Sequence, residues 1–166
     1  MTKIPMSEKY SHPLVFLPAI TLLVWLLNAG TAQAQTGGIR AGITADPSQF
    51  HFGGHLQTDP LIDRLRFRPN IEAGVGDDLT IITFNLEFAY GIPLRNQPWL
   101  VYLGGGPALV LIDRDDNDRG RGDDGDAGGG FNVMVGLEHD QGLFFEFKVG
   151  ALDSPDVKFT VGYSFR

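Results

Sequence analysis

The chain has 166 residues, which suggests a single domain, and its 43% apolar content is ordinary for a folded protein. It contains no cysteine, which excludes a disulfide framework, a zinc–thiolate site and a thiol nucleophile. The formal net charge of −7 and the pI near 4.9 argue against nucleic acid as a partner, because phosphate binding requires a basic surface.

Residues 1–34 have the features of a secretory signal peptide. A positive start that includes Lys3 is followed by the apolar segment 14–27 and by a small-x-small cleavage pattern ending at Ala34. The apolar segment is shorter than the roughly 20 residues that a membrane-spanning helix needs. We therefore predict export of the chain, cleavage after Ala34, and one folded domain over residues 35–166.

From residue 35 onward the chain alternates between apolar and polar residues, and no segment has helical periodicity. Clusters of Gly, Pro, Asp and Asn interrupt the alternation at short intervals. An all-β fold is therefore expected. The pattern predicts eight strands, at 38–45, 49–57, 65–75, 79–92, 99–112, 128–139, 143–152 and 156–165.

The predicted strands combine one apolar face with one face of charged, amide and glycine residues. In the last strand Phe159 and Val161 share one face, whereas Lys158 and Thr160 lie on the other. A soluble barrel would turn the apolar faces inward, and a membrane barrel turns them toward lipid. The alternation alone is compatible with either arrangement.

Three further features favour an eight-stranded antiparallel transmembrane up-and-down β-barrel. Glycines lie mainly on the polar faces, which suits the narrow interior of such a barrel. Charges of both signs share those faces and can form a buried, paired network. Aromatic residues at strand ends suit a membrane–water interface, and they are Tyr90, Trp99, Tyr163 and Phe165. The predicted lumen network comprises Arg40, Arg66, Arg68, Glu72, Glu87, Glu138, Glu146, Lys148 and Lys158.

An even number of strands places both ends of the domain at one rim, taken as the periplasmic side. The longest connection, 113–127, then lies outside. Asp113, Asp115 and Asn117 match the start of a calcium-binding loop, but Asp118 stands where that loop requires glycine. We therefore predict an exposed acidic loop rather than a calcium site. Its acidic residues are Asp113, Asp115, Asp116, Asp118, Asp123, Asp124 and Asp126.

Three segments carry a resemblance to a known family: RPNIEAGVG at 68–76, PWLVYLGGGP at 98–107 and VGYSF at 161–165. They resemble small outer-membrane β-barrel proteins, the OmpA/OmpX-like and opacity-type group, and the similarity of pattern covers residues 35–166. Arg166 departs from the family, whose chains end on the aromatic residue. The resemblance implies a monomer without cofactor in the bacterial outer membrane. Its partners would be membrane lipid, lipopolysaccharide and the barrel-assembly machinery.

Some barrels of this family are lipid A deacylases that use a His-x-Ser pair on one strand, and no such pair occurs here. His139 and Ser164 are the nearest candidates for a base and a nucleophile, which must lie within hydrogen-bond distance. His51 and His55 would lie about 13 Å apart along a strand, too far to share one metal ion. We predict that these two histidines face the lumen, and that the chain has no catalytic, metal or cofactor site.

These observations favour a non-enzymatic outer-membrane protein that contributes to envelope integrity or surface interaction. A pore is not expected, because an eight-stranded interior is filled by its own side chains. Two alternatives stay open. One is a lipid-A-modifying enzyme of the deacylase type, and the other is a soluble periplasmic barrel that binds an apolar ligand.

Overall fold

The computed structural model describes residues 36–76, 79–114 and 126–165. The signal peptide predicted for residues 1–34, with cleavage after Ala34, lies outside these residues. The described residues contain no helical segment with the length and hydropathy that a membrane-crossing helix needs. Five acidic residues of the predicted loop also lie outside them: Asp115, Asp116, Asp118, Asp123 and Asp124.

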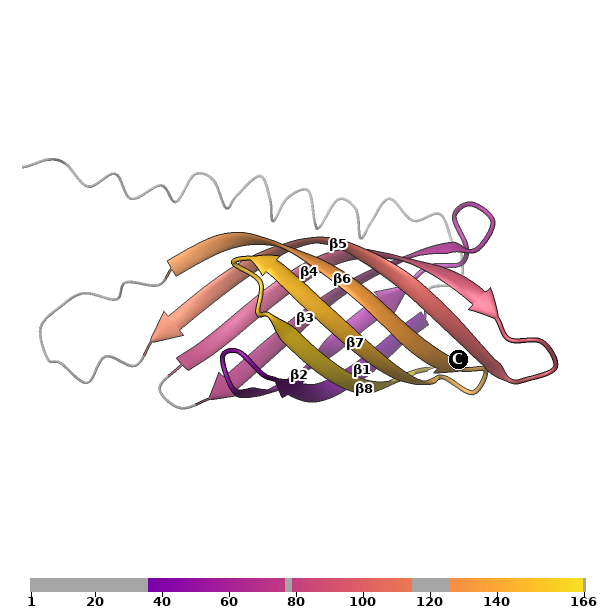
Figure 1. Cartoon of the computed structure of the whole chain (residues 1–166), viewed down its shortest axis with the longest axis horizontal. Helices are drawn as coiled ribbons and strands as arrows, with labels where there is room; N and C mark the ends of the chain where they lie inside the picture. The colour runs from indigo at the N-terminus through magenta and orange to yellow at the C-terminus, as the bar shows by residue number, and fades with distance from the viewer. Residues whose placement is uncertain (1–35, 77–78, 115–125, 166) are drawn as a thin grey trace, which may run out of the picture. The chain divides into compact units, whose positions relative to one another are not determined.

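Eight strands form a closed barrel in which each strand pairs with its neighbours in chain order (Figure 1). The strands are β1 (Thr36–Thr44), β2 (Gln49–Gln57), β3 (Leu65–Gly76), β4 (Leu79–Pro93), β5 (Trp99–Arg114), β6 (Asp126–His139), β7 (Leu143–Leu152) and β8 (Val157–Ser164). All pairs are antiparallel, and the pairing of β1 with β8 closes the sheet. The predicted eight-stranded antiparallel up-and-down barrel is confirmed, with every strand end within two residues of its predicted place.

The ends of β5 and β6 differ from the prediction. Asp113 and Asp126, expected in the acidic loop, belong to these strands, where Asp113 pairs with Thr80 and Asp126 with Ile112. Both aspartates are exposed. Their carboxylates therefore stay in solvent while the backbone continues the ladder, so charge at these positions does not end the strands.

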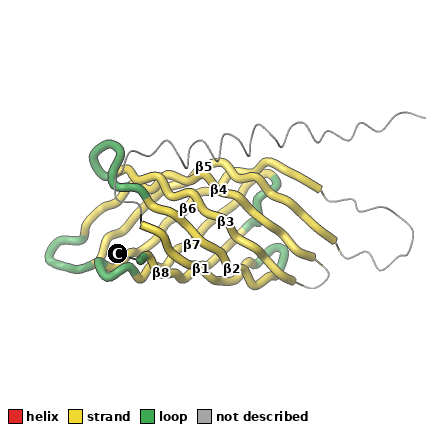
Figure 2. The backbone as a smooth tube through the Cα atoms, turned by 180° about the vertical axis from the view of Figure 1, so that it is seen from behind, coloured by secondary structure: helices red, strands yellow, loops and turns green. Residues whose placement is uncertain are grey.

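Most large apolar side chains of the strands point away from the barrel axis. In β8, Phe159 and Tyr163 are 45% and 43% exposed, whereas Lys158 and Thr160 on the other face of the strand are buried. The same alternation recurs around the barrel, whose strands run obliquely around the axis (Figure 2). The barrel thus has an apolar outer wall and a polar interior, the arrangement of a transmembrane barrel.

The strands alternate in direction, so the barrel has two distinct rims. β1 begins and β8 ends at one of them, called here the terminal rim, together with turns 58–64, 94–98 and 140–142. The opposite end, called here the loop rim, carries turns 45–48 and 153–156. The four strand-end aromatics lie at the terminal rim as expected, and the Tyr163 and Phe165 rings are 5.8 Å apart.

Two inward-facing aromatic rings lie over glycines on a neighbouring strand. A Cβ atom at Gly136 would come 2.2 Å from Tyr102 Cζ, and one at Gly162 would come 2.3 Å from Phe144 Cζ. Tyr102 and Phe144 are almost fully buried. The narrow interior holds these rings only because the neighbouring strands carry no side chain at these two positions.

Candidate functional site

Glu72 of β3 lies at the centre of the charged interior. Its Oε1 accepts a hydrogen bond from Arg40 Nη1 at 2.9 Å, and its Oε2 accepts one from Lys158 Nζ at 2.7 Å. Lys148 Nζ is 3.6 Å from the first of these oxygens. Arg40 on β1 and Lys158 on β8 border the closing seam, so a carboxylate from β3 ties the two seam strands together across the lumen.

Lys148 of β7 connects Glu72 to two further carboxylates. Its Nζ lies 2.7 Å from Glu87 Oε1 and 3.6 Å from Glu146 Oε1. The phenol of Tyr102 donates to the other oxygen of Glu146 at 2.9 Å, and Arg40 Nη1 donates to Glu146 Oε1 at 3.3 Å. Glu72, Glu87 and Glu146 are therefore connected through Lys148 and Arg40 in one charged network.

Three asparagines extend the network across β3, β4 and β6. Asn132 donates to Asn85 at 2.8 Å, Asn85 donates to Asn70 at 2.7 Å, and Asn70 donates to Glu87 Oε2 at 2.7 Å. Each amide therefore donates to the next group and orients it. The alternation placed these positions on the polar face, but nothing in the sequence indicated that they would form one chain.

Arg68 is held mainly by aromatic faces. Its guanidinium carbon lies 4.6 Å from the centre of the Tyr102 ring and 5.0 Å from that of Phe144. The nearest carboxylate oxygen, on Glu146, is 3.8 Å away. Cation–π contacts are strongest when desolvated, and Arg68 is only 1% exposed.

Eight of the nine charged side chains predicted for the lumen are buried there, four cations and four carboxylates. The equal numbers leave this buried set without net charge, which lowers the cost of burying it. Arg66 differs, because its side chain is 27% exposed and its guanidinium lies 3.8 Å from Glu138 at the terminal rim. The buried set is Arg40, Arg68, Glu72, Glu87, Glu138, Glu146, Lys148 and Lys158.

The histidines make hydroxyl contacts inside the barrel. His51 lies 3.0 Å from Thr44 Oγ1 and 2.9 Å from Thr160 Oγ1, and both of its neighbours face the lumen. His55 and Ser164 are 2.9 Å apart. Among the described residues, no group of three or more His, Cys, Asp or Glu side chains is arranged to hold a metal ion.

The candidate pair of His139 and Ser164 is not brought together. His139 Nδ1 instead lies 2.9 Å from Asp140 Oδ1 at the terminal rim. Ser164 pairs with His55, and its side chain is fully buried. A nucleophile must reach its substrate as well as its base, and Ser164 does not meet the first condition.

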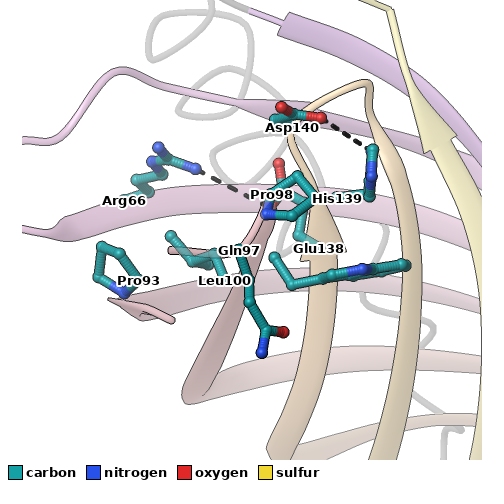
Figure 3. Close-up of a pocket in the computed structure, with 9 residues that line it drawn as sticks. Arg66, Pro93, Gln97, Pro98, Leu100, Glu138, His139 and Asp140 are labelled. Atoms are coloured by element: carbon teal, nitrogen blue, oxygen red, sulfur yellow. Dashed lines mark ion pairs between the residues drawn. The ribbon is translucent and has the colours of Figure 1, made fainter. Parts of the chain in front are cut away.

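A pocket of about 260 Å³ lies at the terminal rim, between the β4–β5 and β6–β7 turns. It is called here the rim pocket. Figure 3 shows the lining side chains and the ion pairs that Arg66 and Asp140 form with neighbouring residues. The alternation did not indicate this site. Its lining is Arg66, Pro93, Gln97, Pro98, Trp99, Leu100, Glu138, His139 and Asp140.

The closed barrel, apolar outside and charged within, defines the class of small eight-stranded transmembrane β-barrels. Its fold is similar to the N-terminal β-barrel domain of Pseudomonas aeruginosa OprF, with a TM-score of 0.58 and 16% identity over 81% of this chain and 100% of that one. It is also similar to Neisserial surface protein A (NspA), with a TM-score of 0.55 and 16% identity over 78% and 90% of the two chains. No protein-family model matches the chain, and no curated protein matches it in sequence.

Proposed function

We propose that the chain is a non-enzymatic bacterial outer-membrane protein that contributes to envelope integrity or surface interaction. The observation that carries the proposal is the outward apolar wall around a buried, charge-balanced interior. In water this arrangement would expose a continuous apolar band, whereas in a membrane the band packs against the acyl chains of the lipids. Closure of the barrel adds support, because it leaves no sheet edge unpaired in the membrane.

The paired interior supports a structural rather than a pore-forming role. An open aqueous channel would let water reach the charged side chains, yet Glu87 and Glu146 are at most 1% exposed. Each is bound by a cation or an amide from another strand. The network thus stabilises the barrel against separation of its strands.

Export, orientation and partners follow from the same proposal. A signal peptide over residues 1–34, cleaved after Ala34, would deliver the chain to the barrel-assembly machinery. The loop rim would face outward, where Asp113 and Asp126 place negative charge near lipopolysaccharide. Membrane lipid surrounds the apolar wall.

The two alternatives from the sequence receive less support. A deacylase requires an accessible nucleophile, and Ser164 is fully buried beside His55. A soluble barrel that binds an apolar ligand requires an apolar interior, whereas the interior here is lined mainly by charged and amide side chains.

Electrophoresis and fractionation test the proposal. An intact outer-membrane barrel migrates differently in detergent gels before and after boiling and sediments with outer-membrane fractions. A chain that stays soluble and monomeric without detergent would overturn the membrane assignment. Lipid A profiles from cells with and without the protein should be identical, and a lost or shortened acyl chain would overturn the non-enzymatic assignment.

A further inference from the structure

The rim pocket draws its lining from both faces of the barrel wall. Leu100 packs in the interior against the cluster of Ala89, Tyr102 and Met134, and Glu138 is 3% exposed. Trp99, one position away on β5, instead lies 6.3 Å from the ring of the outward-facing Phe145. The pocket therefore joins the mouth of the lumen to the outer, lipid-facing wall. Such a place suits an amphipathic ligand whose polar end passes over the rim.

The charges of the rim pocket have opposite signs and are accessible. Arg66 is 27% exposed, and its 3.8 Å separation from Glu138 exceeds the length of a charge-assisted hydrogen bond. Asp140 is 63% exposed although it pairs with His139. A carboxylate offers about four acceptor positions, so one that already has partners can still accept a further donor. The pocket thus presents a cationic and an anionic group to one ligand.

The rest of the lining suits the body of a small headgroup. Pro93, Pro98 and Trp99 supply apolar surface, and Gln97 supplies both a donor and an acceptor. The volume of about 260 Å³ is many times what a single water molecule needs, so the pocket has room for a small polar headgroup. The pocket lies among the terminal-rim aromatics, the height at which headgroups meet a barrel.

We propose that the rim pocket binds the phosphoethanolamine headgroup of a membrane phospholipid. Arg66 receives the phosphate and Asp140 receives the ammonium group, while the acyl chains lie on the outer wall beside Trp99 and Phe145. A choline headgroup fits less well because its quaternary ammonium donates no hydrogen bond, and a glycerol headgroup brings no cation to Asp140. The inference rests on the proposed membrane location.

Fluorescence of Trp99 tests the proposal directly. Of the two tryptophans, Trp25 lies in the segment that the proposed cleavage after Ala34 removes, so Trp99 is the single reporter of the mature chain, and Trp25→Phe gives the same result in an uncleaved chain. The protein is reconstituted in phosphatidylcholine bilayers that contain equal fractions of phosphatidylethanolamine or phosphatidylcholine with brominated acyl chains. Bromine quenches tryptophan on contact. We expect about three- to fivefold preferential association of the ethanolamine lipid, the size of one exposed ion pair.

Charge variants then show which side chains produce the preference for the ethanolamine lipid. Arg66→Gln and Asp140→Asn should each abolish it, and Asp140→Glu should retain it. The matched controls Arg95→Gln and Asp59→Asn lie in exposed turns outside the pocket lining and should leave it unchanged. Every variant is first required to show heat-modifiable migration, so loss of folding is recognised separately.

The outcomes are distinct. Equal quenching by the two brominated lipids, or a preference that survives both Arg66→Gln and Asp140→Asn, overturns the headgroup site. Soluble glycerophosphoethanolamine that binds as tightly as the bilayer lipid would show that the acyl chains contribute nothing, and it would overturn the assignment of the ligand as a membrane lipid. If neither brominated lipid quenches Trp99, the chain is not in the bilayer, and the proposed function itself fails.

Discussion

At the scale of single residues, Glu72 best shows how the interior depends on pairing. One carboxylate contacts Arg40, Lys148 and Lys158, and all four side chains are buried. Removal of one partner from a buried ion pair leaves a buried charge without compensation. The resulting loss in the free energy of unfolding is far larger than the contribution of an exposed ion pair. A small chemical change at Glu72 should therefore have a large effect on the stability of the barrel.

Glu72→Gln should destabilise the folded barrel by about 3–5 kcal/mol, because it leaves the interior with one uncompensated positive charge. Urea unfolding of the protein in lipid vesicles measures the change. Asp59→Asn, which neutralises an exposed turn carboxylate, is the matched control and should stay within about 0.5 kcal/mol of the unmodified chain. Adding Lys158→Met to Glu72→Gln should recover part of the loss, and an equally unstable double variant would contradict the charge-balance explanation.

Gly136→Ala should destabilise the barrel by about 1–3 kcal/mol through overpacking against Tyr102. The added Cβ would lie 2.2 Å from Cζ of Tyr102, whose ring is held in place by neighbouring side chains. Gly129→Ala is the control in the same strand, because a Cβ there meets nothing within 4 Å. Thermal unfolding followed by gel mobility compares the two, and equal midpoints would show that the interior can shift to accept the methyl group.

At the scale of the element, each strand is a two-sided unit whose faces meet different surroundings. In β6, Val133 is 59% exposed on the outer wall, whereas its neighbours Asn132 and Met134 are each 2% exposed. The pleat enforces this division, because successive side chains point to opposite faces. The environment of a residue is therefore set by the parity of its position in the strand.

Val133→Arg should cost about 2–4 kcal/mol in a bilayer, the penalty for a cation facing lipid near the midplane. Leu152→Arg provides the comparison, because Leu152 is 84% exposed at the loop rim and the penalty there falls to about 0–1 kcal/mol. Unfolding in vesicles measures both variants. Similar costs at the two positions would indicate that the outer wall is not embedded in lipid.

At the scale of the whole barrel, closure and charge balance act together. The β1–β8 pairing removes the sheet edges, and the side chains from the strands fill the space that closure creates. Tyr102 and Phe144 cross the interior, and Arg68 lies against both rings. Such an interior leaves little room for an ion to pass.

The reconstituted barrel should therefore show no stable conductance steps in planar bilayers, as expected for eight strands with a filled interior. The double variant Tyr102→Ala and Phe144→Ala removes both rings and should raise the conductance measurably. Steady ion flow through the unmodified protein, at the level of the double variant, would contradict a filled interior.

The sequence by itself determined the number of strands, their limits to within two residues, and the division of each strand into an apolar and a polar face. These are local properties, because a period of two can be recognised in a few consecutive residues. The same alternation placed Lys148, Lys158 and Glu72 on the polar faces of their strands. The alternation does not indicate which strands lie next to one another.

Only the tertiary structure decided which side chains meet. Arg40 reaches Glu146, 106 residues away, and Ser164 meets His55 rather than His139, because barrel closure sets which strand positions share a level in the lumen. The rim pocket likewise arises where turns from separate hairpins adjoin. Strand register and closure depend on all eight strands at once, and therefore no local pattern contains them.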